Sequence, residues 1–220
     1  GHNGVETEVV YPGCCGMPQL EQGDIARVAE KAKSTAAALR PYIDNGKDII
    51  ALVPSCALMM KFEWPLIVPN DENIKLLAQA TFDISEYVMA IANNEGLADG
   101  LSPIGGNIAL HLACHTRAQQ MGPKGAEMLR AIPDAKVTVI ERCSGHGGSW
   151  GVKKQNFGIA TKFATQTVKK IADVNPTHVC SECPLAGKHI VQGMRALGED
   201  TPAIEQSTHP IQVLAKAYGF

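Results

Sequence analysis

The sequence contains no long hydrophobic run, since its apolar stretches are short and none approaches the roughly 20 residues that cross a bilayer. It also lacks an excess of charge of one sign, because 20 basic and 22 acidic side chains give a net charge of −2. Without a basic run that could follow a phosphate backbone, we expect no nucleic-acid partner. The chain opens with the polar Gly1-His2-Asn3-Gly4 rather than a signal-peptide pattern, so we expect a cytoplasmic protein.

The composition is that of a globular protein. Of the 220 residues, 45% are hydrophobic and 19% are charged, which suffices for one large or two small domains. The chain has seven cysteines, an odd number, in a sequence much longer than the small secreted domains that depend on disulfides. In a reducing cytoplasm, clustered cysteines indicate metal or redox chemistry.

The cysteines follow an internal repeat. Tyr11-Pro12-Gly13-Cys14-Cys15-Gly16 aligns with Ile140-Glu141-Arg142-Cys143-Ser144-Gly145, and Cys56 aligns with Cys183. In the same alignment Val53 takes the position of Cys180. Each first block follows a β-rich segment (Glu8–Tyr11 and Lys136–Ile140) and leads into a helical segment. The repeat therefore predicts two similar halves.

The local patterns predict alternating strands and helices. Apolar residues recur at helical spacing in Ile25–Ile43, and Asn45-Gly46 provides a stop; Phe157–Ala172 has the same character. The remaining predicted strands are Val5–Tyr11, Ile49–Val53, Asn107–Leu112, Val137–Ile140 and Thr177–Val179. One further helix is predicted to begin at Pro184, and a final short helix to span His209–Tyr218. This order is typical of an α/β protein with parallel sheets.

We expect two pseudo-repeated Rossmann-like units, residues 1–100 and 107–220, with the glycine-rich Leu97–Asn107 between them. The first repeat is N-terminally incomplete, since Val5–Tyr11 would open the unit with no preceding element. We therefore expect this chain to be the C-terminal part of a longer protein. Because ligands collect beyond the carboxyl ends of parallel strands, the cysteines should lie at those ends.

The second half offers four thiols: Cys114, Cys143, Cys180 and Cys183. Four thiolates are the ligand set of a [4Fe–4S] cluster or of a closed structural zinc site. The first half offers three, Cys14, Cys15 and Cys56, and needs a fourth ligand from elsewhere. A buried cysteine can equally be a plain core residue, and Cys56 and Cys114 are open to that interpretation.

Other side chains near the cysteines have weaker claims. His111, His115 and His146 could be ligands, donors to cluster sulfur or ordinary polar residues. Ser144 suits a hydrogen bond better than iron ligation. Arg142, Lys153 and Lys154 would offset the charge of a thiolate-ligated cluster or simply be solvated, and Trp64 and Trp150 are expected to be packing residues. Gly145-His146-Gly147-Gly148-Ser149 lacks the Lys-Ser/Thr of a phosphate loop.

These blocks resemble the cysteine-rich CCG iron–sulfur proteins. The matching residues are Cys14-Cys15-Gly16, His111-Leu-Ala-Cys114-His115, Arg142-Cys143-Ser-Gly145-His, Ser-Glu-Cys183-Pro-Leu and His209-Pro210-Ile-Gln-Val-Leu. The family includes the B subunit of heterodisulfide reductase and the iron–sulfur subunit of anaerobic glycerol-3-phosphate dehydrogenase, and the second motif of the latter subunit also reads Cys-Ser-Gly. In the heterodisulfide reductase B subunit, the full motif has five cysteines and holds a non-cubane cluster. Here Val53 and Ser144 stand at two of those positions, which leaves a non-cubane catalytic cluster in doubt.

The resemblance implies an iron–sulfur subunit of a multi-subunit oxidoreductase, which passes electrons between a flavoprotein dehydrogenase or other redox subunit and a quinone or other acceptor. One alternative is thiol/disulfide catalysis at the first cysteine cluster, as in heterodisulfide reductase. The other is a non-redox scaffold, with zinc in one or both sites. We expect the protein in the cytoplasm or at the inner face of the membrane, with any membrane contact made through partner subunits.

Overall fold

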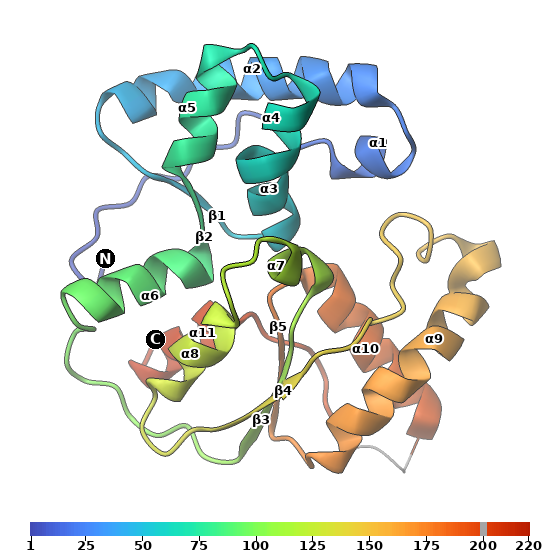
Figure 1. The fold of residues 1–220 in the computed structure, drawn as a ribbon. Coiled ribbons are helices and arrows are strands. Elements are labelled where there is room, and N and C mark those ends of the chain that lie inside the picture. Colours follow the sequence, from blue (N-terminus) through green and yellow to red (C-terminus); the bar gives the residue numbers. More distant parts are fainter. Residues whose placement is uncertain (199–201) are drawn as a thin grey trace. The chain divides into compact units, whose positions relative to one another are not determined.

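The computed structural model describes residues 1–198 and 202–220, and the chain divides into two compact units, Gly1–Ala98 and Asp99–Phe220 (Figure 1). In each unit, helices pack around a small sheet of parallel strands. Among the described residues no helix combines the length and apolar character that a membrane crossing requires.

The first unit is mostly helical, with one short pair of strands. Its elements are α1 (Met17–Glu21), α2 (Ile25–Asp44), β1 (Ile49–Ala51), α3 (Pro54–Leu58), the π-helix η1 (Met59–Glu63), α4 (Trp64–Ile67), α5 (Glu72–Ala80), β2 (Thr81–Asp83) and α6 (Ile84–Asn94). Strands β1 and β2 pair in parallel, with Ile49 opposite Thr81.

Helix α2 is the main support of this unit. The Asp24 side chain accepts a hydrogen bond from the Arg27 amide at its start, which satisfies one of the free N–H groups of the first turn. One stripe of the helix is buried: Val28, Ala32, Thr35, Ala36 and Leu39. That stripe packs into a core with the fully buried Trp64, Ile74 and Leu77.

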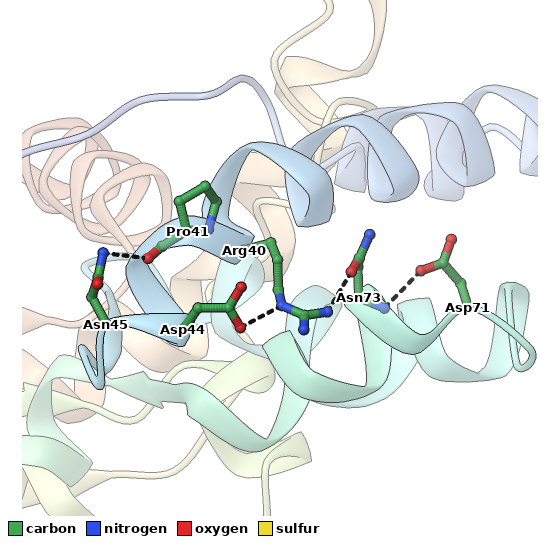
Figure 2. A network of polar contacts seen from close by, with 6 residues as sticks. All are labelled: Arg40, Pro41, Asp44, Asn45, Asp71 and Asn73. Carbon is green, nitrogen blue, oxygen red and sulfur yellow. Dashed lines mark hydrogen bonds and ion pairs between the residues drawn. The ribbon is translucent and has the colours of Figure 1, made fainter.

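The C-terminal end of α2 is attached to α5 by polar contacts (Figure 2). Arg40 donates to Asp44 Oδ1 over 2.6 Å and to Asn73 Oδ1 over 2.9 Å. Asn73 belongs to the first turn of α5, whose free amides donate to the Asp71 carboxylate. The Asn45 amide group caps the Pro41 carbonyl, and Gly46 (φ 75°) ends the helix. These contacts set the register of α2 against α5.

Helices α3, η1 and α4 follow one another without a break from Pro54 to Ile67. Pro65 has no N–H to donate to the preceding turn, and the chain widens into the π-helical turn η1 just before it. This widened turn leads into the fully buried Trp64, whose indole Nε1 donates to the Cys15 carbonyl over 3.1 Å. Trp64 is therefore a packing residue, as predicted, and it also anchors the Cys14-Cys15 turn.

The second unit is a three-stranded parallel sheet with helices on both faces. Its elements are β3 (Asn107–His111), α7 (Cys114–Ala118), α8 (Lys124–Arg130), β4 (Lys136–Ile140), α9 (Lys154–Asp173), β5 (His178–Ser181), α10 (Pro184–Leu197) and α11 (Pro210–Ala217). The strand order is β4-β3-β5. Helices α9 and α10 lie on one side of the sheet, and α8 and α11 lie on the other (Figure 1).

The central strand β3 explains why this sheet is stable. Ile108, Ala109 and Leu110 are fully buried because the strand has a neighbour on each edge and helices on each face. Ala109 packs with Ile140 and Val179 of the flanking strands, and with Ala164, Val168, Ile190 and Met194 of α9 and α10. The carboxyl ends of all three strands consequently lie at one edge of the sheet.

The predicted α/β class with parallel strands is confirmed, while the interpretation as two Rossmann-like units stays a prediction. Two expectations were wrong. Val5–Tyr11 forms no strand, and its apolar residues Val9 and Tyr11 are 97% and 82% exposed, because β1 pairs only with β2. Trp150 is no packing residue, since 44% of it is exposed.

Candidate metal centre

Three cysteines of the second unit follow the ends of the three parallel strands. Cys114 and Cys143 come three residues after β3 and β4, and Cys183 comes two residues after β5. Their proximity affects the acid–base behaviour of Cys114. Partial burial raises the pKa of its thiol, and negative charge on Cys183 and Cys143 raises it further. Cys143 and Cys183 thus lie close enough to Cys114 to affect its pKa.

Cys180, the fourth predicted ligand, has different surroundings. It lies within β5, opposite Leu110 of β3, and its side chain is fully buried. Burial raises the pKa of its thiol to about 12, and the negative charge of Glu182 contributes to the shift. Cys180 thus sits inside the sheet, whereas Cys183 begins the following helix as its N-cap residue. The predicted four-thiol set stays a prediction.

The turn around Cys143 is shaped to hold a thiolate. The Gly145 amide donates to Cys143 Sγ over 3.3 Å, the kind of N–H···S contact that stabilises a negatively charged sulfur. Gly145 has φ 76°, and a methyl group added there would lie 2.5 Å from the Ala160 carbonyl oxygen. Only glycine fits this position, because the turn rests directly on the backbone of α9.

A chain of hydrogen bonds connects the three strand ends through His111. The Cys183 amide donates to Ser181 Oγ over 3.3 Å, and Ser181 Oγ lies 3.1 Å from His111 Nδ1. His111 Nε2 lies 2.9 Å from the Arg142 carbonyl, which can only accept, so Nε2 carries the proton. Burial lowers the pKa of His111, which keeps the ring neutral. Both ring nitrogens are therefore engaged in bracing the site rather than directed at a ligand.

Glu182 braces the other side of the site. Its carboxylate is fully buried and accepts hydrogen bonds from the Thr116 hydroxyl (3.0 Å) and the Ala113 amide (3.4 Å). Ala113 is the N-cap residue of α7, which begins with Cys114. Glu182 thus attaches the turn of Cys114 to the turn of Cys183. The sequence patterns above did not predict this role, although a charged residue directly after a buried strand is a signal that could have revealed it.

The other predicted residues occupy supporting positions. Ser144 is buried, and its Oγ lies 3.5 Å from the His146 amide, which is consistent with hydrogen bonding rather than ligation. The buried His146 ring packs edge to face with His189, 6.0 Å between centroids. His115 lies half-buried in α7. Arg142 hydrogen-bonds to Gln166 of α9, and Lys153 and Lys154 are exposed.

The first unit holds a second set of thiols. Cys15 and Cys56 are 3.2 Å apart at Sγ, and the Gly16 amide lies 3.5 Å from Cys14 Sγ. Gly16 has φ 85°, so this turn shares the positive glycine φ and the N–H···S contact of the Cys143-Ser144-Gly145 turn. The hydrogen bond from Cys56 lowers the pKa of Cys15 to about 7, whereas the same contact raises the pKa of Cys56. Of the pair Cys15 and Cys56, Cys15 therefore ionises first.

The donor set fits thiolate-ligated iron. Cysteine thiolates with backbone N–H donors beside them are the usual ligands of iron–sulfur clusters. Zinc accepts the same thiolates. Within residues 1–198 and 202–220, no group of three or more His, Cys, Asp or Glu side chains is already arranged around a single ion position.

Comparison with known proteins finds a family of cysteine-rich domains that matches part of this chain. Residues 108–189 match the sequence profile of the CCG family, described as a cysteine-rich domain. This segment contains β4, β5, all of β3 except Asn107, and all the cysteines of the second unit. The resemblance inferred from the motifs is thereby confirmed.

More specifically, 93% of the chain matches 49% of the C subunit of anaerobic glycerol-3-phosphate dehydrogenase of Escherichia coli, with 23% identity. It is 25% identical to the B subunit of the fumarate reductase (CoM/CoB) of Methanothermobacter marburgensis, over 84% of this chain and 35% of that protein. It is 26% identical to an uncharacterized iron–sulfur protein of Methanocaldococcus jannaschii, over 85% of this chain and 35% of that protein. The chain thus spans about half the length of the first of these relatives, and less of the other two.

Proposed function

We propose that the protein is an iron–sulfur electron-transfer subunit of an oxidoreductase complex. It would pass electrons between a flavoprotein dehydrogenase and a quinone or other acceptor. The observation that carries the proposal is the position of Cys114, Cys143 and Cys183 after three neighbouring parallel strands, with His111 and Glu182 bracing their turns. The relatives, which include a dehydrogenase subunit, a reductase subunit and an iron–sulfur protein, support the same role.

The proposed cofactor of the second unit is a [4Fe–4S] cluster. Cys114, Cys143 and Cys183 would hold three irons. Cys180 would complete the four-thiol set only if its thiol left the interior of β5, and otherwise the fourth ligand comes from outside these four thiols. When bound, the cluster supplies one-electron chemistry. The chain's own contribution is to place N–H donors such as that of Gly145 beside the sulfur ligands and to fix the separation of their turns through buried hydrogen bonds. The trio Cys14, Cys15 and Cys56 would take a second metal centre only with a further ligand.

Metal and sulfide analysis tests the proposal. Protein purified and reconstituted without oxygen should contain iron and acid-labile sulfide, absorb near 400 nm, and give an EPR signal on reduction with dithionite. Zinc without iron in both sites would refute the electron-transfer role and support a zinc-stabilised scaffold.

A second function is favoured by the contact between Cys15 and Cys56. A thiolate at Cys15 could attack one sulfur of a disulfide substrate and release the other half as a thiol. Cys56 would then displace the second thiol, which leaves a Cys15–Cys56 disulfide after a two-electron exchange. An added dithiol would reduce that disulfide to two thiols before the next cycle. The substitution Cys15→Ser should abolish such turnover and leave the EPR signal of the second unit unchanged. An unaltered turnover rate would exclude this function.

A further inference from the structure

The basic residues of the second unit are concentrated in one stretch of the chain. Residues 142–172 contain six basic side chains and no acidic one, although the protein as a whole has a net charge of −2. All six are exposed: Arg142, Lys153, Lys154, Lys162, Lys169 and Lys170. Five of them flank or belong to α9, so this helix and the loop before it carry a local positive charge.

Large apolar side chains are exposed among these lysines. On α9, Ile159 is 50% exposed and Phe163 is 71% exposed, one helical turn apart. In the loop before the helix, Val152 is 60% exposed and Trp150 is 44% exposed. We refer to these four residues and the six basic residues together as the α9 surface. Exposed apolar groups within a charged rim are typical of protein docking sites.

The α9 surface lies directly behind one of the candidate ligands. The Thr167 hydroxyl of α9 donates to the Cys143 carbonyl over 2.6 Å, and Gly145 rests on the helix backbone at Ala160 and Ala164. Arg142, next to Cys143 in the chain, hydrogen-bonds to Gln166. The Cys143 turn is thus held against α9, so a partner seated on the outer face of the helix would be separated from Cys143 by little more than the helix itself.

We propose that the α9 surface is the docking site for an acidic redox protein, one whose contact face has an apolar centre surrounded by Asp and Glu side chains. This inference rests on the proposed electron-transfer function and assigns a surface and a partner chemistry to it. The lysines attract the acidic rim and steer association, while Trp150, Val152, Ile159 and Phe163 provide the desolvated centre.

The structure favours a protein over a lipid surface as the occupant. A helix that lies in a membrane interface gathers its apolar residues on the face it inserts. In α9 that continuous apolar stripe, with Ala160, Ala164, Val168 and Ile171, is buried against the rest of the unit. On the exposed face, Lys162 lies between Ile159 and Phe163 along the helix, so this face mixes apolar and charged side chains, as a protein interface does.

Charge reversal tests the inference. The double variant Lys162→Glu with Lys170→Glu changes the α9 surface. The matched control, Lys33→Glu with Lys136→Glu, makes the same change in net charge at exposed positions of α2 and of the amino end of β4.

A second pair of variants tests the apolar part of the surface. Phe163→Ser changes the α9 surface, and its control is Phe220→Ser, a residue that is 76% exposed at the chain end. The probe is a reduced acidic flavodoxin, and stopped-flow absorbance gives the second-order rate of electron transfer to the reconstituted protein.

The wild-type rate should fall by about tenfold or more as salt rises from about 10 to 500 mM. At low salt, reversal of Lys162 and Lys170 should slow the reaction about tenfold, and the control should stay within about twofold. Phe163→Ser should slow it severalfold and Phe220→Ser should not. Dithionite-reduced EPR spectra should be alike in all variants. A missing signal in the wild type would refute the proposed function itself.

Three results would overturn the docking proposal while the EPR signal persists. One is an equal loss of rate in the α9 variant and its control. Another is a rate independent of salt. The third is binding to vesicles of phosphatidylserine and phosphatidylcholine that the α9 reversal abolishes while flavodoxin reduction is unchanged, which would assign the surface to anionic lipid.

Discussion

Two cysteines three residues apart, Cys180 and Cys183, should respond to substitution in opposite ways. Cys180 is fully buried inside β5, whereas Cys183 is partly exposed and begins α10. If position within the sheet decides ligation, Cys180→Ala should damage packing and spare the cluster. Cys183→Ala should spare packing and remove the cluster.

The magnitudes follow from the surroundings of each side chain. Replacing Cys180 by Ala deletes one buried heavy atom, which costs about 0.8 kcal/mol for lost burial plus a cavity contribution, so roughly 1–2 kcal/mol in total. Cys183 makes no side-chain capping bond in α10, so its loss should cost less than about 0.5 kcal/mol in the metal-free protein. The two variants should therefore differ by about 0.5–2 kcal/mol in free energy of unfolding, with Cys180→Ala the less stable.

The assay pairs two measurements on each variant under anaerobic conditions. Urea unfolding of the metal-free protein gives stability, and iron and sulfide content with EPR after reconstitution gives cluster occupancy. Cys180→Ala should keep the iron content of the wild type, and Cys183→Ala should lose most of the iron that the second unit binds. Loss of iron in Cys180→Ala would refute this reasoning and establish the four-thiol set instead.

Further predictions concern the braces of the two sites. Gly145→Ala should destabilise the metal-free protein by about 2–4 kcal/mol, because Gly145 has a positive φ and an added methyl group would meet the Ala160 carbonyl of α9. The control Gly158→Ala, at an open position of α9, should not destabilise it. Glu182→Gln should lower iron content after reconstitution and should alter the EPR line shape, and an unchanged spectrum would remove its positioning role. Trp64→Phe should cost about 1–3 kcal/mol, since the Cys15 carbonyl loses its donor, and should perturb only the first site.

Much of the architecture of the second unit could be predicted from sequence. The apolar runs at Asn107–Leu112 and Val137–Ile140 and the helical period in Phe157–Ala172 match β3, β4 and α9 within a few residues, and Pro184 opens α10 as expected. These signals are local, because burial on both faces makes a parallel strand continuously apolar. The α2 helix was equally evident from its alanine-rich stripe.

Other features depended on contacts that local patterns do not contain. Val5–Tyr11 has the composition of a strand, but a strand forms only where a sheet edge is available, and here it stays exposed. The spacing of Cys180 and Cys183 suggested two ligands from one loop. Which of them lies inside the sheet depends on where β5 stops pairing with β3, and that is set by the neighbouring strand. The role of Glu182 likewise depends on α7 being folded beside it.

The order of the strands has a consequence for how the protein matures. Cys114, Cys143 and Cys183 are far apart along the chain, and they approach one another only after β4 and β5 have both paired with β3. Parallel pairing of this kind requires long connections and forms late in folding. Cofactor insertion should therefore follow completion of the sheet. A chain whose sheet has not formed correctly would therefore bind no cofactor, and its lack of a cluster would distinguish it from correctly folded molecules.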